Sequence, residues 1–298
     1  MSKSTKIILI ILLVLAAIYA IQRLTGRTST TESKKLFTAV DTSKVDSIFI
    51  KEKATILLAR TSDGWQILTP INYPADEGAI NLFLSKLDPS MKATIVADHL
   101  TDSYAYGLDS GAVNLSLRGK SGKILEMLVG NSTPDFTGCY IQVKGYPQVF
   151  EIPENLRSVI LKTVTEWRSK QIFRFSFRDI KAGNFSIGDT LYQFVKIDTA
   201  WHLNKRKVSN ELVENIFSQL TGLSAIDFVD SSISNDNRPL IEYSISLNNN
   251  NNVSGKVFKT SANTILTVST SQTEFVISPT FVASFKDQLS QALKSKNN

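Results

Sequence analysis

The side chains able to do chemistry are few in this chain of 298 residues, and they are scattered along it. The two histidines, His99 and His202, lie far apart, and nothing around them predicts the convergence that a metal pair needs. The single cysteine, Cys139, excludes an intramolecular disulfide and a cysteine-based zinc site. Its neighbours predict a small buried residue at the start of a strand rather than a nucleophile. We therefore expect no metal and no cofactor.

The carboxylates form no evident acid–base pair. Glu211 and Glu214 are three residues apart and share one face of a predicted helix, while Asp76 and Glu77 fall in the first turn of another. Favourable interaction with a helix N-terminus explains these positions better than general acid–base catalysis. No Gly-x-Ser-x-Gly elbow is present, so the sequence offers no catalytic residue.

Four aromatic residues are the candidate binding residues. Trp65 and Trp201 hold equivalent places at the ends of two predicted hairpins, which favours a role as core anchors, with carbohydrate stacking as the functional alternative. Tyr104 and Tyr106 lie beside Gly107 in a predicted loop. They form either an exposed recognition loop or a local packing cluster.

The surroundings of the two tryptophans repeat, which predicts a duplicated fold. Trp65 and Trp201 are 136 positions apart, and the same separation holds for three apolar pairs in the helices that follow, Ile80 and Ile216, Leu84 and Leu220, and Leu87 and Leu223. A repeat of this length is a whole domain. We expect a first module over residues 36–172 and a second over 173–298.

Both modules are predicted to be α+β, with mainly antiparallel sheets and packed helices, because strands and helices do not alternate regularly. Asp76 and Ser209 are expected to cap equivalent helices. A long helix is expected from Pro153 to about Lys170, with Leu156, Ile160, Thr163 and Trp167 on its inner side.

The N-terminal segment predicts a transmembrane signal anchor. Residues 7–22 are uncharged and nearly all aliphatic, and as a helix they span about 24 Å, close to the thickness of the hydrocarbon core. The alternative is a signal peptide that is cleaved after Ala20. We expect a cytoplasmic tail over residues 1–6, a polar tether over 23–35 and a periplasmic body anchored by a single pass in the inner membrane.

The distribution of charge argues against nucleic-acid binding. Residues 1–35 carry a net charge of +5, whereas the rest of the chain carries +1. Binding to nucleic acid normally needs a concentrated basic face on the folded part. The basic cluster is better explained by the flanks of a membrane segment.

The sequence also resembles the DUF4340 family, a bacterial domain of unknown function. The resembling pieces, besides the N-terminal anchor, are Asp63-Gly64-Trp65 with Pro70 and Ala75-Asp76, then Tyr106-Gly107-Leu108-Asp109, Val129-Gly130-Asn131-Ser132-Thr133-Pro134 and Tyr140-Ile141-Gln142-Val143. Where members usually have proline after the Gly-Leu-Asp element, this chain has Ser110-Gly111. The likeness covers roughly residues 36–230 and, more weakly, the rest.

This resemblance implies a membrane-anchored extracytoplasmic protein associated with ABC-transporter systems similar to the gliding-motility auxiliary components. It supplies no catalytic residue. The leading hypothesis is a non-enzymatic accessory or scaffold protein whose partners are membrane proteins such as transporter subunits. The alternatives are a cell-envelope hydrolase or polysaccharide-processing enzyme with a site between the modules, and a soluble ligand-binding protein released by cleavage.

Overall fold

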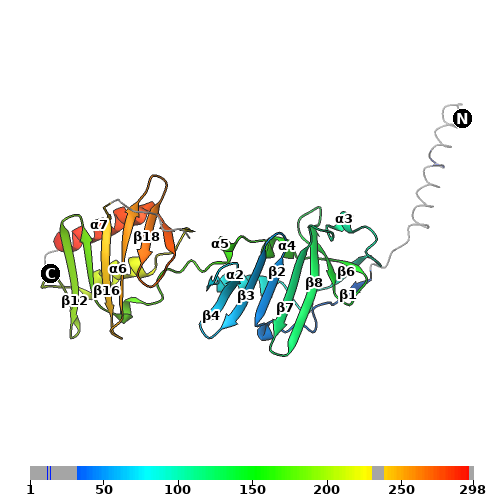
Figure 1. Ribbon diagram of the computed structural model, residues 1–298, viewed down its shortest axis with the longest axis horizontal. Coiled ribbons are helices and arrows are strands. Elements are labelled where there is room, and N and C mark those ends of the chain that lie inside the picture. Colours follow the sequence, from blue (N-terminus) through cyan, green and yellow to red (C-terminus); the bar gives the residue numbers. More distant parts are fainter. Residues whose placement is uncertain (1–11, 13, 15–31, 230–237, 295–298) are drawn as a thin grey trace. The chain divides into compact units, whose positions relative to one another are not determined.

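The computed structural model describes Leu12, Val14 and residues 32–229 and 238–294 (Figure 1). The chain divides into two compact units, Met1–Trp167 and Arg168–Asn298. The sequence placed this boundary a few residues later, between 172 and 173. The division comes earlier because the guanidinium of Arg168 lies over the ring of Phe228 at 4.2 Å and Lys170 accepts a backbone hydrogen bond from Ala225. The connecting residues therefore belong to the second unit.

The first unit is an antiparallel sheet of ten strands with short helices. Its strands are β1 (Ser33–Lys34), β2 (Ser47–Lys51), β3 (Thr55–Thr61), β4 (Gly64–Thr69), β5 (Tyr73–Pro74), β6 (Ala93–Ala97), β7 (Val113–Gly119), β8 (Gly122–Ser132), β9 (Cys139–Val143) and β10 (Val149–Ile152). Its helices are η1 (Thr42–Lys44), α2 (Glu77–Ser85), α3 (Ser103–Tyr106), α4 (Leu156–Ile160) and α5 (Val164–Trp167). The strand order is β1-β6-β10-β9-β8-β7-β2-β3-β4-β5.

The second unit is an antiparallel sheet of nine strands with two longer helices. Its strands are β11 (Ile180–Ile187), β12 (Thr190–Ile197), β13 (Ala200–Leu203), β14 (Arg206–Val208), β15 (Asp227–Val229), β16 (Ile241–Leu247), β17 (Asn252–Lys259), β18 (Thr264–Val268) and β19 (Glu274–Ile277). Its helices are η2 (Phe177–Asp179), α6 (Asn210–Thr221) and α7 (Pro279–Lys294). The strand order is β14-β13-β12-β11-β16-β17-β18-β19-β15.

The two sheets share one topology. Read from the other end, the second sheet runs β15-β19-β18-β17-β16-β11-β12-β13-β14, which corresponds strand by strand to β6-β10-β9-β8-β7-β2-β3-β4-β5. In each unit a helix follows the strand at one edge of the sheet, β5 or β14. The next strand in the chain then lies on the far side of the sheet, where β15 is the edge strand and β6 is flanked by β1. Antiparallel sheets with helices packed on them are the α+β architecture that the sequence predicts.

Alternation along the strands gives each sheet two different faces. In β2, Ile48 and Ile50 are buried while Phe49, between them, is half-buried on the opposite face. Figure 1 shows α2, α4 and α5 on one side of the first sheet, and α6 and α7 on one side of the second. We call the side of the first sheet that carries Phe49 its outer face.

The helix α2 illustrates how the helix-covered face is held. Asp76 caps it, because its carboxylate accepts a hydrogen bond of 2.9 Å from the backbone N–H of Ala79. A helix of this length is not stable alone in water. Burial of Ile80 and Phe83, both with no exposed surface, contributes roughly 1.5–3 kcal/mol for each side chain and holds α2 against the sheet.

The long helix expected over residues 153–170 is a wrong prediction. The structure has two short helices instead, α4 and α5, with a break over residues 161–163. The backbone N–H of Thr163 donates to the Glu166 carboxylate at 2.7 Å, and the N–H of Glu166 donates back to the Thr163 hydroxyl oxygen at 3.3 Å. This reciprocal capping box starts a new helix, and the periodicity of the apolar residues does not reveal it.

The predicted anchor falls largely outside the described residues. Of residues 7–22, only Leu12 and Val14 are described, and both are helical. Within the described part of the chain, no helix has the length and apolar character needed to cross a bilayer.

Candidate functional site

The two tryptophans belong to the cores of their units. Trp65 is 4% exposed, and the guanidinium of Arg60 lies 5.0 Å from the centre of its ring. Trp201 is 1% exposed and packs on the rings of Phe177 and Phe217 at centroid distances of 5.8 and 5.6 Å. Neither indole presents a face to solvent on which a sugar could stack. This placement favours the core-anchor interpretation of both residues.

The other reactive side chains have structural surroundings. Burial raises the pKa of the Cys139 thiol to about 11, and the thiol lies 3.3 Å from the backbone carbonyl of Glu154, to which it donates. Such a thiol stays protonated near neutral pH and is a poor nucleophile. His99 is exposed after β6, and His202 is half-buried on β13. Among the residues with described positions, no three His, Cys, Asp or Glu side chains gather closely enough to hold a metal ion.

The carboxylates considered as acid–base groups lie at helix starts. Asp76 caps α2 in the first unit, and Glu211 is exposed in the first turn of α6 in the second. Ser209 caps α6 by accepting a hydrogen bond of 3.2 Å from the backbone N–H of Leu212. These positions agree with interaction between the carboxylates and the helix N-terminus.

The Tyr104 and Tyr106 segment forms a one-turn helix, α3, where the sequence predicted a loop. Asp102 caps it by accepting a hydrogen bond from Ala105 at 3.1 Å, and Gly107 ends it with a φ of 63° that favours glycine. Tyr104 is 82% exposed. Tyr106 is half-buried and meets the ring of Tyr140 edge-on at 5.1 Å. The structure thus gives Tyr104 an exposed position and Tyr106 a packing role.

Two segments that are distant in sequence meet at α3. A Cβ atom on Gly130 would collide with the backbone carbonyl of Tyr106, and one on Gly107 would collide with the side chain of Asn131. Glycine at positions 107 and 130 therefore permits a close approach between α3 and β8. The segments Tyr106-Gly107-Leu108-Asp109 and Val129-Gly130-Asn131-Ser132 therefore pack against each other.

Arg157 of α4 joins β8 to the neighbouring residues Gly111 and Glu52 through hydrogen bonds. Its guanidinium donates to the carbonyls of Val129 and Gly130 at 3.3 Å each, to the carbonyl of Gly111 at 3.2 Å and to the Glu52 carboxylate at 3.2 Å. A surface hollow of about 440 Å³ lies here, lined in part by Tyr104, Asp109, Asn131 and Arg157. Because the guanidinium already makes four hydrogen bonds within the protein, we interpret this region as a structural clamp.

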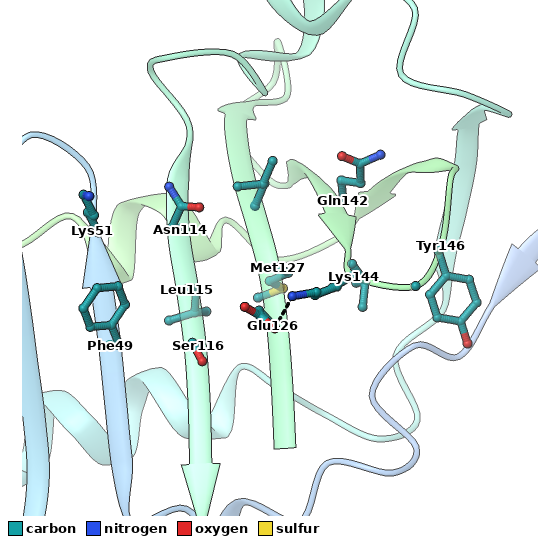
Figure 2. Close-up of a pocket in the computed structure, with 13 residues that line it drawn as sticks. Phe49, Lys51, Asn114, Leu115, Ser116, Glu126, Met127, Gln142, Lys144 and Tyr146 are labelled. Carbon is teal, nitrogen blue, oxygen red and sulfur yellow. Dashed lines mark ion pairs between the residues drawn. The ribbon is translucent and has the colours of Figure 1, made fainter. Parts of the chain in front are cut away.

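A larger hollow of about 640 Å³ lies over the outer face of β2, β7, β8 and β9 (Figure 2). One row of paired residues crosses it: Phe49 is opposite Ser116, and Ser116 is opposite Glu126. Lys144, the residue directly after β9, continues the row, since its backbone N–H donates to the Glu126 carbonyl at 2.9 Å. An aromatic ring, a hydroxyl, a carboxylate and an ammonium group therefore lie side by side.

A second row runs beside the first. Lys51 is opposite Asn114, Asn114 is opposite Leu128, and Leu128 is opposite Gln142. Two carboxamides thus flank one aliphatic side chain, with an ammonium group at the β2 end. Tyr146, which is 43% exposed, borders the hollow beyond β9. This arrangement of hydrogen-bonding groups around apolar surface is typical of ligand pockets.

The charges of the hollow are unevenly neutralised. The Glu126 carboxylate lies 2.9 Å from the Lys123 ammonium and 3.0 Å from that of Lys144. Hydrogen bonds from Lys123 and from Lys144 hold the pKa of Glu126 below its usual range. Lys51 forms no ion pair with any described residue, so the hollow carries excess positive charge.

Ser116 stands out among the lining residues. It is 8% exposed, and its hydroxyl has no hydrogen-bond partner among the described residues. A buried hydroxyl without a partner costs free energy, and most buried polar groups in folded proteins are paired. Ser116 is one of the residues that line the hollow.

Motifs in the sequence do not identify this surface. None of Phe49, Asn114 and Ser116 belongs to a motif, and Gln142 appears only within the family-resembling segment Tyr140-Ile141-Gln142-Val143. Only the pairing of four strands brings these residues together. One feature of the sequence points to this surface. Phe49 and Leu128 are large apolar residues at positions where the alternation along a strand predicts a side chain that faces away from the core.

Comparison with known protein families gives a match over the middle of the chain. The family model described as Domain of unknown function (DUF4340) matches residues 65–240, which is more than half of the chain. No curated protein and no solved structure matches this sequence.

Proposed function

The chain belongs to the DUF4340 family, and from that premise we propose that it is a membrane-anchored accessory protein that presents binding surfaces outside the cytoplasm. The observation that carries the binding role is the hollow on the outer face of the first sheet. It combines about 640 Å³ of space with a buried, unpartnered Ser116 hydroxyl. A surface built in this way fits the recognition of another molecule.

The anchoring part of the proposal rests on the uncharged segment of residues 7–22. Leu12 and Val14, the described residues of this segment, are helical and are 65% and 52% exposed. Exposed aliphatic side chains on a helix are stable where lipid surrounds them. Basic residues on both sides of the segment, Lys6 and Arg23 among them, suit the two membrane surfaces.

The shared topology supports a duplication in which one ancestral unit was copied. The equivalent strand orders and the equivalent buried positions of Trp65 and Trp201 fit a fold that was kept for its shape. In this proposal the two sheets present surfaces for binding, and no step of the function requires a reactive centre.

The proposed partners are membrane proteins of the same envelope, with ABC-transporter subunits as the first candidates. The near-neutral charge of residues 36–298 favours such partners over nucleic acid. Residues 1–6 are proposed to be cytoplasmic, and the two units are proposed to lie in the periplasm.

Two measurements test this proposal. Fractionation of cells that express the untagged chain should recover it with the inner membrane, and protease added to spheroplasts should digest both units. Affinity purification of the full chain in mild detergent, at native levels, should recover a membrane-protein partner. Recovery in the soluble fraction, or protection of both units from protease, would rule out the anchored extracytoplasmic arrangement.

A further inference from the structure

The two units provide an internal comparison, because the same fold carries different residues on equivalent faces. Arg60 pairs with Trp65, and Lys196 pairs with Trp201. Counting from these pairs across the neighbouring strands, Ile48 corresponds to Gly183. The next residue along each strand then places Phe49 of the first unit at the position of Asn184 in the second.

The rest of the first row becomes polar in the second unit. Phe49 is opposite Ser116, whereas Asn184 is opposite Ser244. The position of Glu126, opposite Ser116, is taken by Ser254, opposite Ser244. The aromatic ring and the carboxylate are thus absent from this row of the second unit.

The second row differs in the same way. The Asn114 and Leu128 pair corresponds to Glu242 and Lys256, which form an ion pair of 3.1 Å with each other. Side chains that satisfy one another in this way leave little for a ligand to bind. Because the second unit folds with polar residues here, the fold does not require Phe49 or Leu128 to face outward.

The buried hydroxyl of Ser116 is an independent indication of a ligand. Its counterpart Ser244 is half-buried, and the Ser244 hydroxyl is not among the buried polar atoms that lack a partner. Of these two equivalent serines, only Ser116 combines a buried hydroxyl with the lack of a hydrogen-bond partner among the described residues. The apolar surface and the orphaned hydroxyl occur together in one hollow.

We propose that this hollow of the first unit binds an acidic oligosaccharide. The apolar ring faces of sugars pack on Phe49 and Leu128, which lie in neighbouring rows. The carboxamides of Asn114 and Gln142 each offer a donor and an acceptor to sugar hydroxyls, and the Ser116 hydroxyl gains a partner. This inference deepens the proposed binding role by naming a ligand class.

The charges select an acidic sugar over a neutral one. Lys51 and Lys144 lie at opposite ends of the two rows, and Glu126 is the carboxylate between them. Because Lys51 has no described ion-pair partner, a sugar carboxylate gains a charge-assisted hydrogen bond there. The volume of about 640 Å³ lies within the range of roughly 300–1,000 Å³ that ligand pockets occupy.

Calorimetric titration of the full chain in mild detergent tests the proposal, with tetragalacturonate as the acidic probe and cellotetraose as the neutral one. Tetragalacturonate should bind, and its affinity should fall by about fivefold or more in Phe49→Asn, which installs the residue of the second unit, and in Lys51→Ser. Raising the salt concentration should weaken binding to the wild type more than to Lys51→Ser.

Two further variants separate binding from folding. Val195→Asn makes the same kind of apolar-to-amide change at a 42% exposed position of the second unit, and it should bind like the wild type. Ser116→Ala removes a hydroxyl that has no partner, so its melting temperature should be unchanged or higher while its affinity falls about threefold or more.

The proposal is overturned if tetragalacturonate does not bind, if cellotetraose binds as tightly, or if binding is unchanged in both Phe49→Asn and Ser116→Ala. Because the titration does not depend on anchoring, its failure leaves the membrane location open to its own test. Likewise, a soluble location would leave the titration result standing.

Discussion

Loss of the Arg157 guanidinium should destabilise the first unit. Replacement by methionine keeps an unbranched stem of similar packing and removes every guanidinium hydrogen bond. The side chain of Arg157 is 19% exposed, and its four acceptors come from three separate parts of the unit: the Glu52 carboxylate, the carbonyl of Gly111 and two carbonyls of β8. The substitution therefore removes the hydrogen bonds that join α4 to β8, to Gly111 and to Glu52.

The expected cost follows from those acceptors. Val129 and Gly130 are buried, so each carbonyl that loses its charged donor costs roughly 1–2 kcal/mol. Gly111 is exposed and recovers a hydrogen bond from water. The ion pair with Glu52 adds at most about 0.5 kcal/mol because both side chains retain access to solvent. We expect Arg157→Met to lower the free energy of unfolding of the first unit by about 3 kcal/mol.

Hydrogen exchange measured by mass spectrometry on the full chain reports the loss of stability separately for the first and the second unit. A loss of about 3 kcal/mol should make the slowest amides of β7, β8 and β9 exchange on the order of 100-fold faster. Amides of the second unit should keep their rates. Arg118→Met is the matched control, because Arg118 is exposed on β7 and its guanidinium makes no hydrogen bond to the described residues. The clamp interpretation fails if Arg157→Met accelerates exchange less than tenfold, or if Arg118→Met accelerates it equally.

Three further predictions concern single residues of the first unit. Gly130→Ala should lower the melting temperature of that unit by several degrees, because the new methyl group collides with the backbone of α3. Gly111→Ala is the control and should change the melting temperature little, because a Cβ there makes an ordinary contact at 3.5 Å. Equal effects of the two substitutions would contradict the close approach of β8 to α3. Cys139 should resist alkylation at pH 7 and react only on unfolding, because burial raises the pKa of its thiol to about 11; rapid alkylation of the folded chain would contradict this. The pKa of Glu126 is lowered in the folded state. The contribution of Glu126 to stability is therefore present above the ordinary pKa of a glutamate and is lost as the pH falls through the pKa of the folded state. Carboxyl NMR titration should show the pKa of Glu126 rising in Lys144→Met, and an unchanged pKa would contradict the ion pair between Glu126 and Lys144.

Sequence patterns were sufficient to predict the broad architecture because it depends on local and repeated signals. The equal spacing of Trp65 and Trp201 predicted a copied domain, and the two sheets do share their strand order. Asp76 and Ser209 were identified as helix caps because a short polar side chain directly precedes an apolar periodic stretch. Such signals lie within a few residues of one another, so a sequence shows them directly.

The features that the sequence did not reveal depend on contacts between distant segments or on competing local signals. The break between α4 and α5 arises because the Thr163 and Glu166 capping box outweighs the apolar periodicity around it. The role of Arg157 requires knowledge that α4 lies beside β8. The local conformational propensity of a segment does not indicate which distant residue it will contact or with what geometry.

The outer-face hollow shows the same limit. Alternation predicts that Phe49 faces away from the core, but it does not say that Ser116 and Glu126 are its neighbours. The order of β2, β7, β8 and β9 in the sheet decides this, and β2 and β7 are separated in the chain by the segments that form α2, β6 and α3. A candidate site made mostly of strand residues is therefore recognisable only after the sheet is assembled.

The central claim is that one face of the first unit, and not its counterpart in the second, is specialised for binding. Hydrogen exchange of the full chain, with and without saturating tetragalacturonate, tests it most directly. We predict slower exchange in peptides that cover β2, β7, β8 and β9, and unchanged exchange in those that cover β11, β16, β17 and β18. Protection of the second unit alone, equal protection of both sheets, or no protection anywhere would contradict the account.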